Sequence, residues 1–560
     1  MARRADTDHD LVFLPLGGVG EIGMNCALYG TGPEDARDWI MVDCGVTFAS
    51  ELNEPGVDLV FPDIRFAVDE RPNLRGIIIT HAHEDHFGAL LTLWPQLKVP
   101  VYMTPFSAGL LEAKAASEPG APKIKIIRFD VGDVLDLGPF KVEALGVAHS
   151  IPDAVALAIH SPLGTVLHTG DWKIDETPVV GNRTDFDRLA RLGDAGVLAL
   201  VGDSTNAVRD GISPSEADVG RTLAEIIRTA KARVAVTTFA SNIARIRSVG
   251  EAALAADRQV VVIGRAMRRA IDVARELGML DGLPEFLDEE AYGYLPRDRV
   301  VALCTGSQGE ERAALSRIAD DQHKSVALSK GDVVIFSSRT IPGNEKSVNK
   351  VINGLATKHI DIVTDRDALV HVSGHPRREE LARMFAAVRP RICIPVHGEA
   401  LHLNAHEKLA RACGVKDVVM ARDGAIVRLA PGHPEIIDEA FAGRVFRDGH
   451  LVIDPEMSGV GERRKASFAG TVTVTYVVDA KGTLLGDPKV ALIGLPKINA
   501  RAVPFTEIVI DAARGVIEGF PKARRKDSDA VNDAVKRAVR SAVNEAWGKK
   551  PICNVIAHIV

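Results

Sequence analysis

The sequence predicts an α/β protein built from more than one domain. Short runs of aliphatic and β-branched residues, such as 76–79 and 259–263, alternate with helix-forming stretches such as 217–230. The chain has 560 residues, which is too long for a single hydrophobic core, so two to four domains are expected. Several strand-like runs end in histidine or aspartate, and open α/β sheets place their sites at such strand ends.

Composition narrows the class of protein further. No apolar run approaches the roughly 20 residues that a membrane span requires, and MARRADTDHD is followed by no signal-peptide pattern. The formal net charge of −7 gives no sign of nucleic-acid binding, so any such binding must rely on a local basic surface. The cysteines form no C-x-x-C pair, which indicates reduced thiols in a cytoplasmic protein. They are Cys26, Cys44, Cys304, Cys393, Cys413 and Cys553.

Near the N-terminus, Gly18–Gly23 fits the G-x-G-x-x-G pattern of dinucleotide-binding folds. Asp43 even lies about 20 residues further on, where an acid that binds ribose is expected. That fold needs a long helix directly after the glycines, whereas here residues 24–29 are short and Gly30-Thr-Gly-Pro33 breaks the chain. The segment is therefore predicted to form a β-hairpin or meander that bends at its glycines.

Residues 80–89, THAHEDHFGA, hold the densest group of ligand-type side chains in the sequence. The group follows the predicted strand 77–79 and precedes the predicted helix 87–94. His81 and His83 are two residues apart and point the same way in an extended chain, while Asp85 and His86 lie where the chain turns. Imidazoles and a carboxylate together suit zinc or another first-row divalent ion. The alternative is a polar loop whose histidines hydrogen-bond locally.

More candidate ligands follow other strand-like runs. His149 ends the run 142–149 and Asp171 ends the run 165–171, in the order that a two-ion site requires. Much later, His371 and His375 in HVSGH and His397 in PVHGE again follow apolar β-branched stretches. The histidines interpreted as structural or solvated are His160, His168, His402 and His406.

These motifs together resemble a known family. H-x-H-x-D-H, a lone histidine and then TGD are similar to the metallo-β-lactamase fold. GDST (202–205), SGH (373–375) and PVHGE (395–399) resemble its insertion-bearing branch, the β-CASP nucleases. Within that branch the chain most resembles the bacterial ribonuclease J family, in LGGVGEIGMN (16–25), TFASN (238–242), TGSQGE (305–310) and IPGNE (341–345).

The resemblance implies an αββα sandwich interrupted by an inserted β-CASP α/β domain and followed by a small C-terminal α/β domain. Residues 1–213 and 367–445 are expected to form the sandwich, with 368–372 and 391–396 rejoining it, and 214–366 to form the insertion. Residues 446–468 are interpreted as a linker, and 469–560 as the C-terminal domain, which serves self-association in the family. In that domain Val531, Val535, Val539, Val543 and Trp547 predict one buried stripe of a helix.

The resemblance also implies a centre of two divalent ions, with zinc expected first and manganese as the alternative. The implied ligands are His81, His83, His149 and Asp171 for one ion, and Asp85, His86, Asp171 and His397 for the other. Asp171 bridges the ions, while Asp43 and Asp203 support ligands without binding an ion themselves. Asp85 is the candidate for orienting or deprotonating the nucleophile. His375 is expected to stabilise the transition state or to protonate the departing 3′-oxygen.

Substrate-binding residues are implied at two places. The first is the segment His371, Val372, Ser373, Gly374 and His375, whose backbone N–H and hydroxyl groups suit a phosphate. The second is Ser241 with Asn242, for which capping of a helix N-terminus is the alternative interpretation. Both are expected to meet the nucleotide upstream of the cut, including a 5′-monophosphate.

The implied function is a metal-dependent ribonuclease of RNA maturation and decay that leaves 5′-phosphate and 3′-hydroxyl ends. A 5′-to-3′ exonuclease that prefers 5′-monophosphate ends is expected, and endonuclease action stays open. A small-molecule metallo-hydrolase of the same fold does not explain the large insertion, and DNA-processing relatives typically carry valine where this chain has His397. A non-catalytic scaffold is expected to lack ligands.

The expected partners are single-stranded RNA, a second copy of the chain in a homodimer or homotetramer, and RNA-decay proteins. The protein is expected in the cytoplasm and away from membranes.

Overall fold

The computed structural model describes residues 9–50, 52–341 and 343–560, which divide into two compact units. The first unit contains Phe61–Gly443 and the chain up to Thr47, and the second contains Phe48–Val60 and Arg444–Val560. No helix among the described residues is both long enough and apolar enough to span a bilayer.

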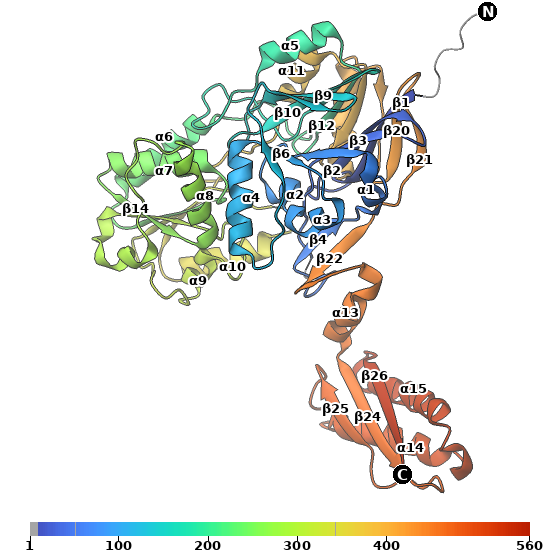
Figure 1. Cartoon of the computed structure of the whole chain (residues 1–560). Coiled ribbons are helices and arrows are strands. Elements are labelled where there is room, and N and C mark those ends of the chain that lie inside the picture. Colours follow the sequence, from blue (N-terminus) through green and yellow to red (C-terminus); the bar gives the residue numbers. More distant parts are fainter. Residues whose placement is uncertain (1–8, 51, 342) are drawn as a thin grey trace, which may run out of the picture. The chain divides into compact units, whose positions relative to one another are not determined.

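Two mixed sheets pack face to face in the first unit (Figure 1). The strands of one sheet, in spatial order, are β21 (Glu435–Glu439), β20 (Ala425–Ala430), β1 (His9–Gly17), β2 (Cys26–Pro33), β3 (Asp38–Val42), β5 (Leu74–Ile78), β6 (Val101–Met103) and β7 (Ile126–Arg128). Those of the other are β19 (Asp417–Val418), β18 (Ile392–Val396), β12 (Ala199–Asp203), β11 (Gly164–His168), β10 (Val155–Ser161), β9 (Phe140–Gly146) and β8 (Val134–Leu137).

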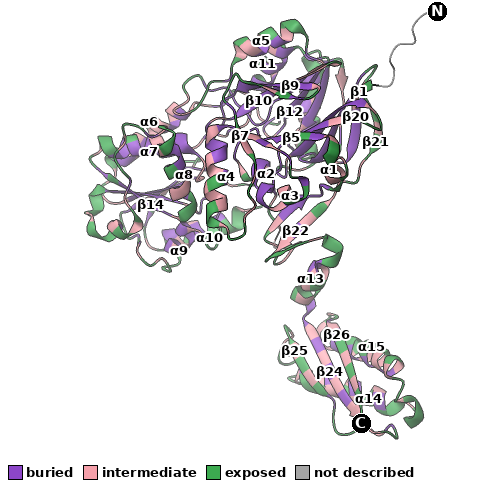
Figure 2. Cartoon of the chain, in the orientation of Figure 1, coloured by how far each residue is buried: buried purple, intermediate pink, exposed green. Residues whose placement is uncertain are grey.

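Apolar side chains from both sheets fill the space between them, and Figure 2 shows strands such as β10 and β12 as mostly buried, whereas the edge strand β21 is largely exposed. Phe13 and Ile78 from the first sheet meet Val142 and Ile394 from the second in one core cluster. Helices cover the outer faces: α5 (Phe186–Ala195), α11 (Arg378–Val388) and α12 (Ala400–Ala412) pack on the second sheet. On the first sheet, Trp39 of β3 packs edge-on against Phe66 of α1 (Arg65–Asp69), with ring centroids 5.2 Å apart. The result is the αββα sandwich that the family resemblance implied.

The predicted hairpin at the N-terminal glycines is confirmed, because β1 pairs antiparallel with β2. The predicted helix at 87–94 is broken instead into α2 (Glu84–Phe87) and α3 (Leu90–Leu97). The chain rejoins the sandwich as β18, while residues 368–372 contain no strand.

An inserted α/β domain lies between β12 and β18, which are themselves adjacent and parallel. Its strands run in the order β14 (Gln259–Ile263), β15 (Val300–Cys304), β13 (Val234–Thr237), β16 (Val333–Phe336) and β17 (Asp361–Val363), and every pair is parallel. Its helices are α6 (Glu216–Thr229), α7 (Ile243–Ala255), α8 (Arg265–Glu276), α9 (Ala314–Ala319) and α10 (Glu345–Ala356). α8 packs against α4 (Pro105–Ser117) of the sandwich so closely that a Cβ on Gly109 would lie 2.7 Å from Val273 Cγ1. A glycine is required at that crossing.

The second unit has its own core. Its sheet has the order β25 (Lys489–Ile493), β24 (Thr471–Val478) and β26 (Ile552–Ile559), and α14 (Phe505–Gly519) and α15 (Ser528–Trp547) share a core cluster with it. The predicted stripe on α15 is confirmed, because its four valines are buried in that cluster.

The segment expected to be a linker, 446–468, belongs to this second unit and contains secondary structure. It carries β22 (Arg444–Asp448), β23 (Leu451–Ile453) and most of α13 (Val460–Ala469). The segment Phe48–Val60 belongs to the same second unit and is hydrogen-bonded to it. The backbone N–H of Asp58 donates to Arg447 O at 2.8 Å, and Arg463 Nη1 donates to Pro55 O at 3.1 Å.

Candidate metal centre and active site

The residues of the H-x-H-x-D-H motif follow β5, and the neighbouring strand β3 supplies an aspartate beside them. His83 is the last extended residue before α2, so Asp85 and His86 lie in the first turn of that short helix. Asp43 directly follows β3 with φ of 63°, a left-handed conformation that aspartate tolerates better than most residues. Its Oδ1 atom accepts from the backbone N–H of Thr80 at 2.8 Å, and its Oδ2 atom lies 2.7 Å from His86 Nδ1. Asp43 thereby fixes which nitrogen of His86 faces the centre.

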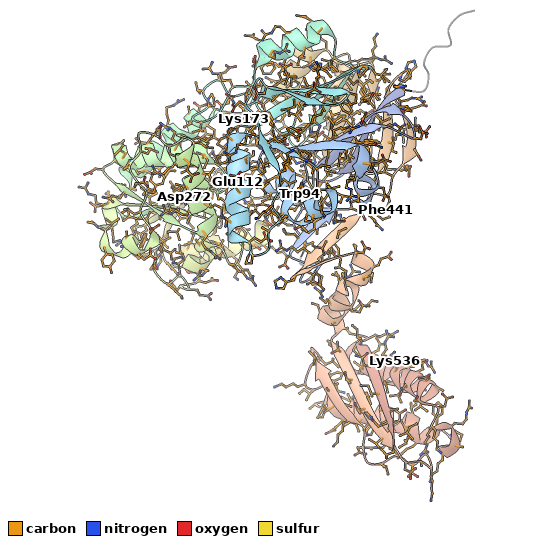
Figure 3. The ribbon with its side chains drawn as sticks, in the orientation of Figure 1. Trp94, Glu112, Lys173, Asp272, Phe441 and Lys536 are labelled. Atoms are coloured by element: carbon orange, nitrogen blue, oxygen red, sulfur yellow. The ribbon has the colours of Figure 1, made fainter. Side chains whose placement is uncertain are left out.

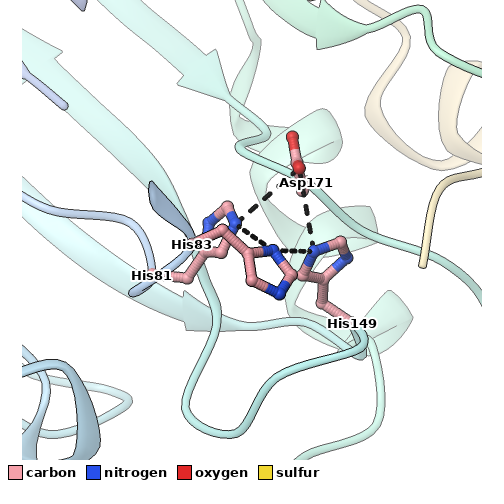
Figure 4. Close-up of side chains that lie close together, drawn as sticks. All are labelled: His81, His83, His149 and Asp171. Atoms are coloured by element: carbon pink, nitrogen blue, oxygen red, sulfur yellow. Dashed lines mark hydrogen bonds and ion pairs between the residues drawn. The ribbon is translucent and has the colours of Figure 1, made fainter. Parts of the chain in front are cut away.

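One group of donors gathers His81, His83, His149 and Asp171 (Figure 4). The Nδ1 atom of His83 lies 3.1 Å from His81 Nε2 and 3.0 Å from His149 Nε2. The Oδ2 atom of Asp171 lies 3.7 Å from each of those two Nε2 atoms. In a tetrahedral zinc site with Zn–N bonds of 2.0–2.1 Å, neighbouring ligand atoms are about 3.3–3.4 Å apart. The four donors therefore have the spacing that a single cation requires.

A second group gathers Asp85, His86, Asp171 and His397. His86 Nε2 lies 3.3 Å from Asp171 Oδ2 and 3.6 Å from Asp85 Oδ2, and His397 Nε2 lies 3.3 Å from Asp85 Oδ2. Among the described residues His397 Nε2 is buried and makes no hydrogen bond of regular geometry, and its contact with Asp85 is an ion pair, as suits an atom that faces a cation site. Asp171 belongs to both groups, and its Oδ1 atom lies 2.8 Å from His397 Nδ1.

Electrostatics in the first group favour neutral imidazoles and an ionised carboxylate. Burial, and next the neighbouring His86, lower the pKa of His81 well below its usual value. Burial and His83 do the same for the pKa of His149. Burial alone raises the pKa of the Asp171 carboxyl, but the surrounding histidines outweigh it and hold that pKa well below the usual range. Neutral imidazole and ionised carboxylate are the forms that bind a cation. In the second group burial acts to lower the pKa of His86 and of His397, but the carboxylates, Asp171 first, outweigh it and raise both pKa values, so these two imidazoles must release a proton to bind a cation.

His375 stands beside these two groups. Its Nδ1 atom lies 2.8 Å from Asp203 Oδ2 and 3.7 Å from Asp171 Oδ2. Burial acts to lower the pKa of His375, but the carboxylates of Asp203 and Asp171 outweigh it and raise that pKa. The His375 side chain is 20% exposed, whereas those of His81 and His149 are fully buried. Its free nitrogen, Nε2, therefore suits proton exchange with a bound molecule.

The segment that leads to His375 is held by contacts that the sequence did not reveal. Asn206, directly after GDST, donates through Nδ2 to Ser373 Oγ at 2.9 Å and to His375 O at 3.1 Å. The carbonyl of Gly374 lies 2.7 Å from His149 Nδ1, and a Cβ on Gly374 would come within 2.6 Å of that nitrogen. Only glycine fits there, and the contact directs the Nε2 atom of His149 toward the centre.

The glycine turn at 18–23 also has a role that its sequence pattern concealed. Gly18 O accepts from the backbone N–H of His397 at 2.7 Å, and the N–H of Gly20 donates to Gly398 O at 3.0 Å. His397 has φ of 53°, so this pairing holds a backbone conformation that histidine seldom adopts. The turn positions a candidate ligand.

Two of the candidate residues lie apart from the centre. Ser241 and Asn242 precede α7 in the inserted domain, and Asn242 Oδ1 accepts from Arg245 N at 2.9 Å as a helix cap. Two histidines interpreted as structural make buried polar contacts: His168 Nδ1 lies 2.8 Å from Tyr29 Oη, and His406 Nδ1 lies 2.9 Å from Ser204 Oγ.

The sandwich and its histidine–aspartate centre define a metallo-hydrolase of the metallo-β-lactamase class. The family model described as "Metallo-beta-lactamase superfamily" matches residues 22–203. "Ribonuclease J, beta-CASP domain" matches 231–355 and "Zn-dependent metallo-hydrolase RNA specificity domain" matches 359–421. "Ribonuclease J C-terminal domain" matches 458–560.

Whole-chain similarity narrows the class to one family. The chain is 56% identical to Ribonuclease J of Sinorhizobium meliloti over 549 residues, which cover 98% of this chain and 97% of that protein. It is 39% identical to Ribonuclease J of Mycolicibacterium smegmatis over 543 residues, covering 96% and 95%. It is 37% identical to Ribonuclease J of Helicobacter pylori strain J99 over 556 residues, covering 97% and 78%. The chain belongs to the ribonuclease J family of metal-dependent ribonucleases.

A solved structure shows the same fold at low sequence identity. The crystal structure of a protein of unknown function from Enterococcus faecalis V583 superposes with a TM-score of 0.52 at 15% identity. The match covers 75% of this chain and all of that one. It supports the fold and carries nothing about function.

Proposed function

We propose that this protein holds two divalent ions and degrades single-stranded RNA from a 5′-monophosphate end, with internal cleavage as a second mode, in RNA maturation and decay in the cytoplasm. The observation that carries the proposal is the pair of donor groups that share Asp171 directly beside the His371–His375 segment. We assign the sandwich to residues 9–213 and 367–443 apart from the segment Phe48–Val60, the insertion to 214–366, and the C-terminal domain to 469–560, with 444–468 as part of the same unit as that domain.

The proposed ligands follow the two donor groups, with Asp171 shared. Nitrogen and oxygen donors without thiolates suit zinc, and manganese is the alternative. When bound, two such ions lower the pKa of water toward about 7 and offset negative charge on the phosphoryl oxygens. The protein's own part is to hold these donors at fixed spacing, through Asp43 on His86 and Gly374 O on His149.

Two side chains act on protons in this proposal. Asp85 is partly exposed and lies at the rim of the second group, where its carboxylate can orient or deprotonate the attacking water. Asp203 accepts from Nδ1 of His375 and keeps that imidazole protonated, so Nε2 can donate to the departing 3′-oxygen. Cleavage then leaves a 5′-phosphate and a 3′-hydroxyl.

The position of the RNA end is inferred from the topology of the inserted domain. The chain leaves β13 toward β14 on one side of the sheet and leaves β16 toward β17 on the other. In open parallel sheets, ligands bind at the carboxyl ends of strands where the chain direction divides in this way. Ser241 and Asn242 follow β13. Burial, and then Arg245, Arg339 and Lys173, lower the pKa of His371 well below its usual value. Because Arg245 is ion-paired with Glu216 and Lys173 with Asp175, Arg339 supplies the positive charge for a ligand here. A terminal phosphate bound at residues 371–375 would complement that charge.

Self-association through the C-terminal domain is the second part of the proposal. Ile493 and Ile556, on the sheet face away from α14 and α15, are 71% and 48% exposed, and Val560 at the chain end is 69% exposed. A second copy of the chain would cover this face, in a dimer or tetramer. Ile556→Arg should shift sedimentation toward the monomer, and an unchanged distribution would exclude this face.

RNA carrying a 3′ label tests the main proposal. Matched single strands with a 5′-monophosphate or a 5′-triphosphate are incubated with the protein and zinc or manganese. Progressive shortening of the monophosphate strand, well ahead of the triphosphate strand, is the expected result. Equal rates would exclude the 5′-end preference, and undiminished activity of His83→Ala would exclude the first donor group as a metal site.

A further inference from the structure

A fully buried ion pair lies inside the inserted domain, on the side that meets the sandwich. Arg245 of α7 has no exposed surface, and Glu216 at the start of α6 is 2% exposed. Arg245 Nη2 donates to both carboxylate oxygens of Glu216, at 2.9 and 3.1 Å, and Nε donates to one of them at 3.2 Å. A charged pair at this depth is costly to desolvate and rarely stabilises a fold as well as apolar side chains do, so it calls for another role.

The third guanidinium nitrogen of Arg245 does not bind Glu216. Nη1 donates to Val370 O at 2.9 Å, to Ser337 O at 2.9 Å and to Ser337 Oγ at 2.5 Å. Ser337 Oγ in turn donates to Val370 O at 2.7 Å. Val370 is the residue directly before the His371–His375 segment, so two buried donors fix the point where that segment begins.

The remainder of the segment is anchored elsewhere. Ser373 and His375 are bound by Asn206, and the His375 ring is bound by Asp203, both of which belong to the sandwich. The contacts of Arg245 therefore set the position of His371 and Val372 more than that of His375.

Through Glu216, the ion pair is also connected to the loop that carries Asp171. The backbone N–H of Glu216 donates to Asp175 Oδ2 at 2.9 Å, and the same carboxylate oxygen lies 2.9 Å from the Nζ atom of Lys173, which Figure 3 labels. Lys173 is two residues beyond Asp171 and is 1% exposed. The first turn of α6 thus joins the loop of a candidate ligand to the beginning of the His371–His375 segment.

We propose that Arg245 is a positioning residue for recognition of the RNA 5′ end: neutralised by Glu216, it holds Val370 O and so places His371 and Val372 against the terminal phosphate. This inference rests on the proposed binding of a 5′-monophosphate by residues 371–375. Arginine is required because its planar guanidinium donates to Glu216 through Nε and Nη2 and to the carbonyls of Ser337 and Val370 through Nη1. A lysine carries the same charge on a single atom and cannot hold both sides.

The test compares two RNA strands of one sequence, one with a 5′-monophosphate and one with a 5′-hydroxyl. The quantity measured is the ratio of kcat/KM on the two strands, because a fold that is only destabilised lowers both values together. In Arg245→Lys this ratio should fall by about ten- to a hundredfold, the effect of small misplacement in a binding site. Ser337→Ala, which removes one of the two donors to Val370 O, should lower the ratio less.

Arg258→Lys is the matched control. Arg258 is also a buried arginine of the inserted domain, 7% exposed, and it donates to the carbonyls of Ala230 and Ala232, away from residue 370. Its substitution should leave the ratio unchanged. A wild-type ratio in Arg245→Lys, or an equal fall in Arg258→Lys, would overturn the inference. If Arg245→Lys does not fold, as judged by circular dichroism, an unchanged ratio in Ser337→Ala overturns it. A wild-type protein that does not distinguish the two strands would refute the proposed 5′-end binding itself.

Discussion

The Nδ1 atom of His86 lies 2.7 Å from the Oδ2 atom of Asp43, a residue that is 43 positions away in the sequence. Because one nitrogen of the imidazole is bound in this way, the other, Nε2, faces Asp171 and Asp85. Asp43→Asn keeps the shape of the side chain but weakens this contact. We expect the affinity for the second ion to fall by about 10–100-fold.

Titration of the metal-free protein with zinc, followed by calorimetry, measures that change. Asp38→Asn is the matched control, since Asp38 begins the strand β3 that Asp43 follows, and it pairs with Arg75 at the surface. Equal affinities in wild type and Asp43→Asn would contradict a role of Asp43 in ordering the ligand.

His375 should act in the chemical step without holding an ion in either donor group. His375→Gln removes the group that Asp203 keeps protonated. Its kcat should fall by about 10²–10⁴-fold, the usual contribution of a general acid. Bound metal, measured by inductively coupled plasma mass spectrometry, should stay at the wild-type level. Loss of an ion together with activity would assign His375 to the ligands.

Asn206 should contribute to kcat/KM although it contacts no candidate metal ligand. Asn206→Ala removes the donor to His375 O and leaves Ser373 Oγ with only the long contact from the backbone N–H of His375, at 3.4 Å. The loss of these partly buried hydrogen bonds, at about 1 kcal/mol each, should lower kcat/KM by about tenfold or more. Steady-state kinetics on 5′-monophosphate RNA checks this, and wild-type kinetics would show that the segment holds its position without Asn206.

His406 should make the fold sensitive to acid. Burial lowers its pKa from 6.5 to about 4, and its Nε2 atom is buried without a partner among the described residues. Between these two pH values the unfolded chain binds a proton that the folded chain does not. The free energy of unfolding should therefore fall by about 3 kcal/mol from pH 7 to pH 4 on account of this residue.

His406→Asn can keep the hydrogen bond to Ser204 Oγ but carries no titratable group. Its urea midpoint should drop less than that of wild type between pH 7 and pH 4.5. If the stability of the two proteins depends on pH in the same way, His406 is not the cause of the loss of stability in acid.

The sequence predicted the features that a local pattern of residues marks. It did not predict the contacts between residues that are far apart in the chain. H-x-H-x-D-H, His149 and Asp171 could be found because each follows a strand-like run, and the α15 stripe because valines recur every four residues. No local pattern marks Asn206 as the partner of Ser373, since the two residues are 167 positions apart. The buried ion pair of Arg245 with Glu216 was equally hidden, because both residues look like ordinary surface charges of amphipathic helices.

The glycine turn at 18–23 illustrates the same limit. Its spacing suggested a nucleotide-binding loop, which was correctly rejected because no long helix comes directly after the glycines. Its contact with the backbone of His397 could not be foreseen, because it requires the residues that follow β18 to return to the turn after β1 once the whole insertion has been passed.

The position of His397 after the inserted domain has a consequence for synthesis of the protein. His81, His83, His149 and Asp171 all precede the insertion, whereas His397 comes after residues 204–391 have been made. On the ribosome all four donors of the first group therefore exist while the second group still lacks a member, and Gly374, which orients His149, is added between the two stages. A nascent polypeptide is thus expected to capture its two cations one after the other, and a prematurely terminated product would retain half a centre and no nuclease activity.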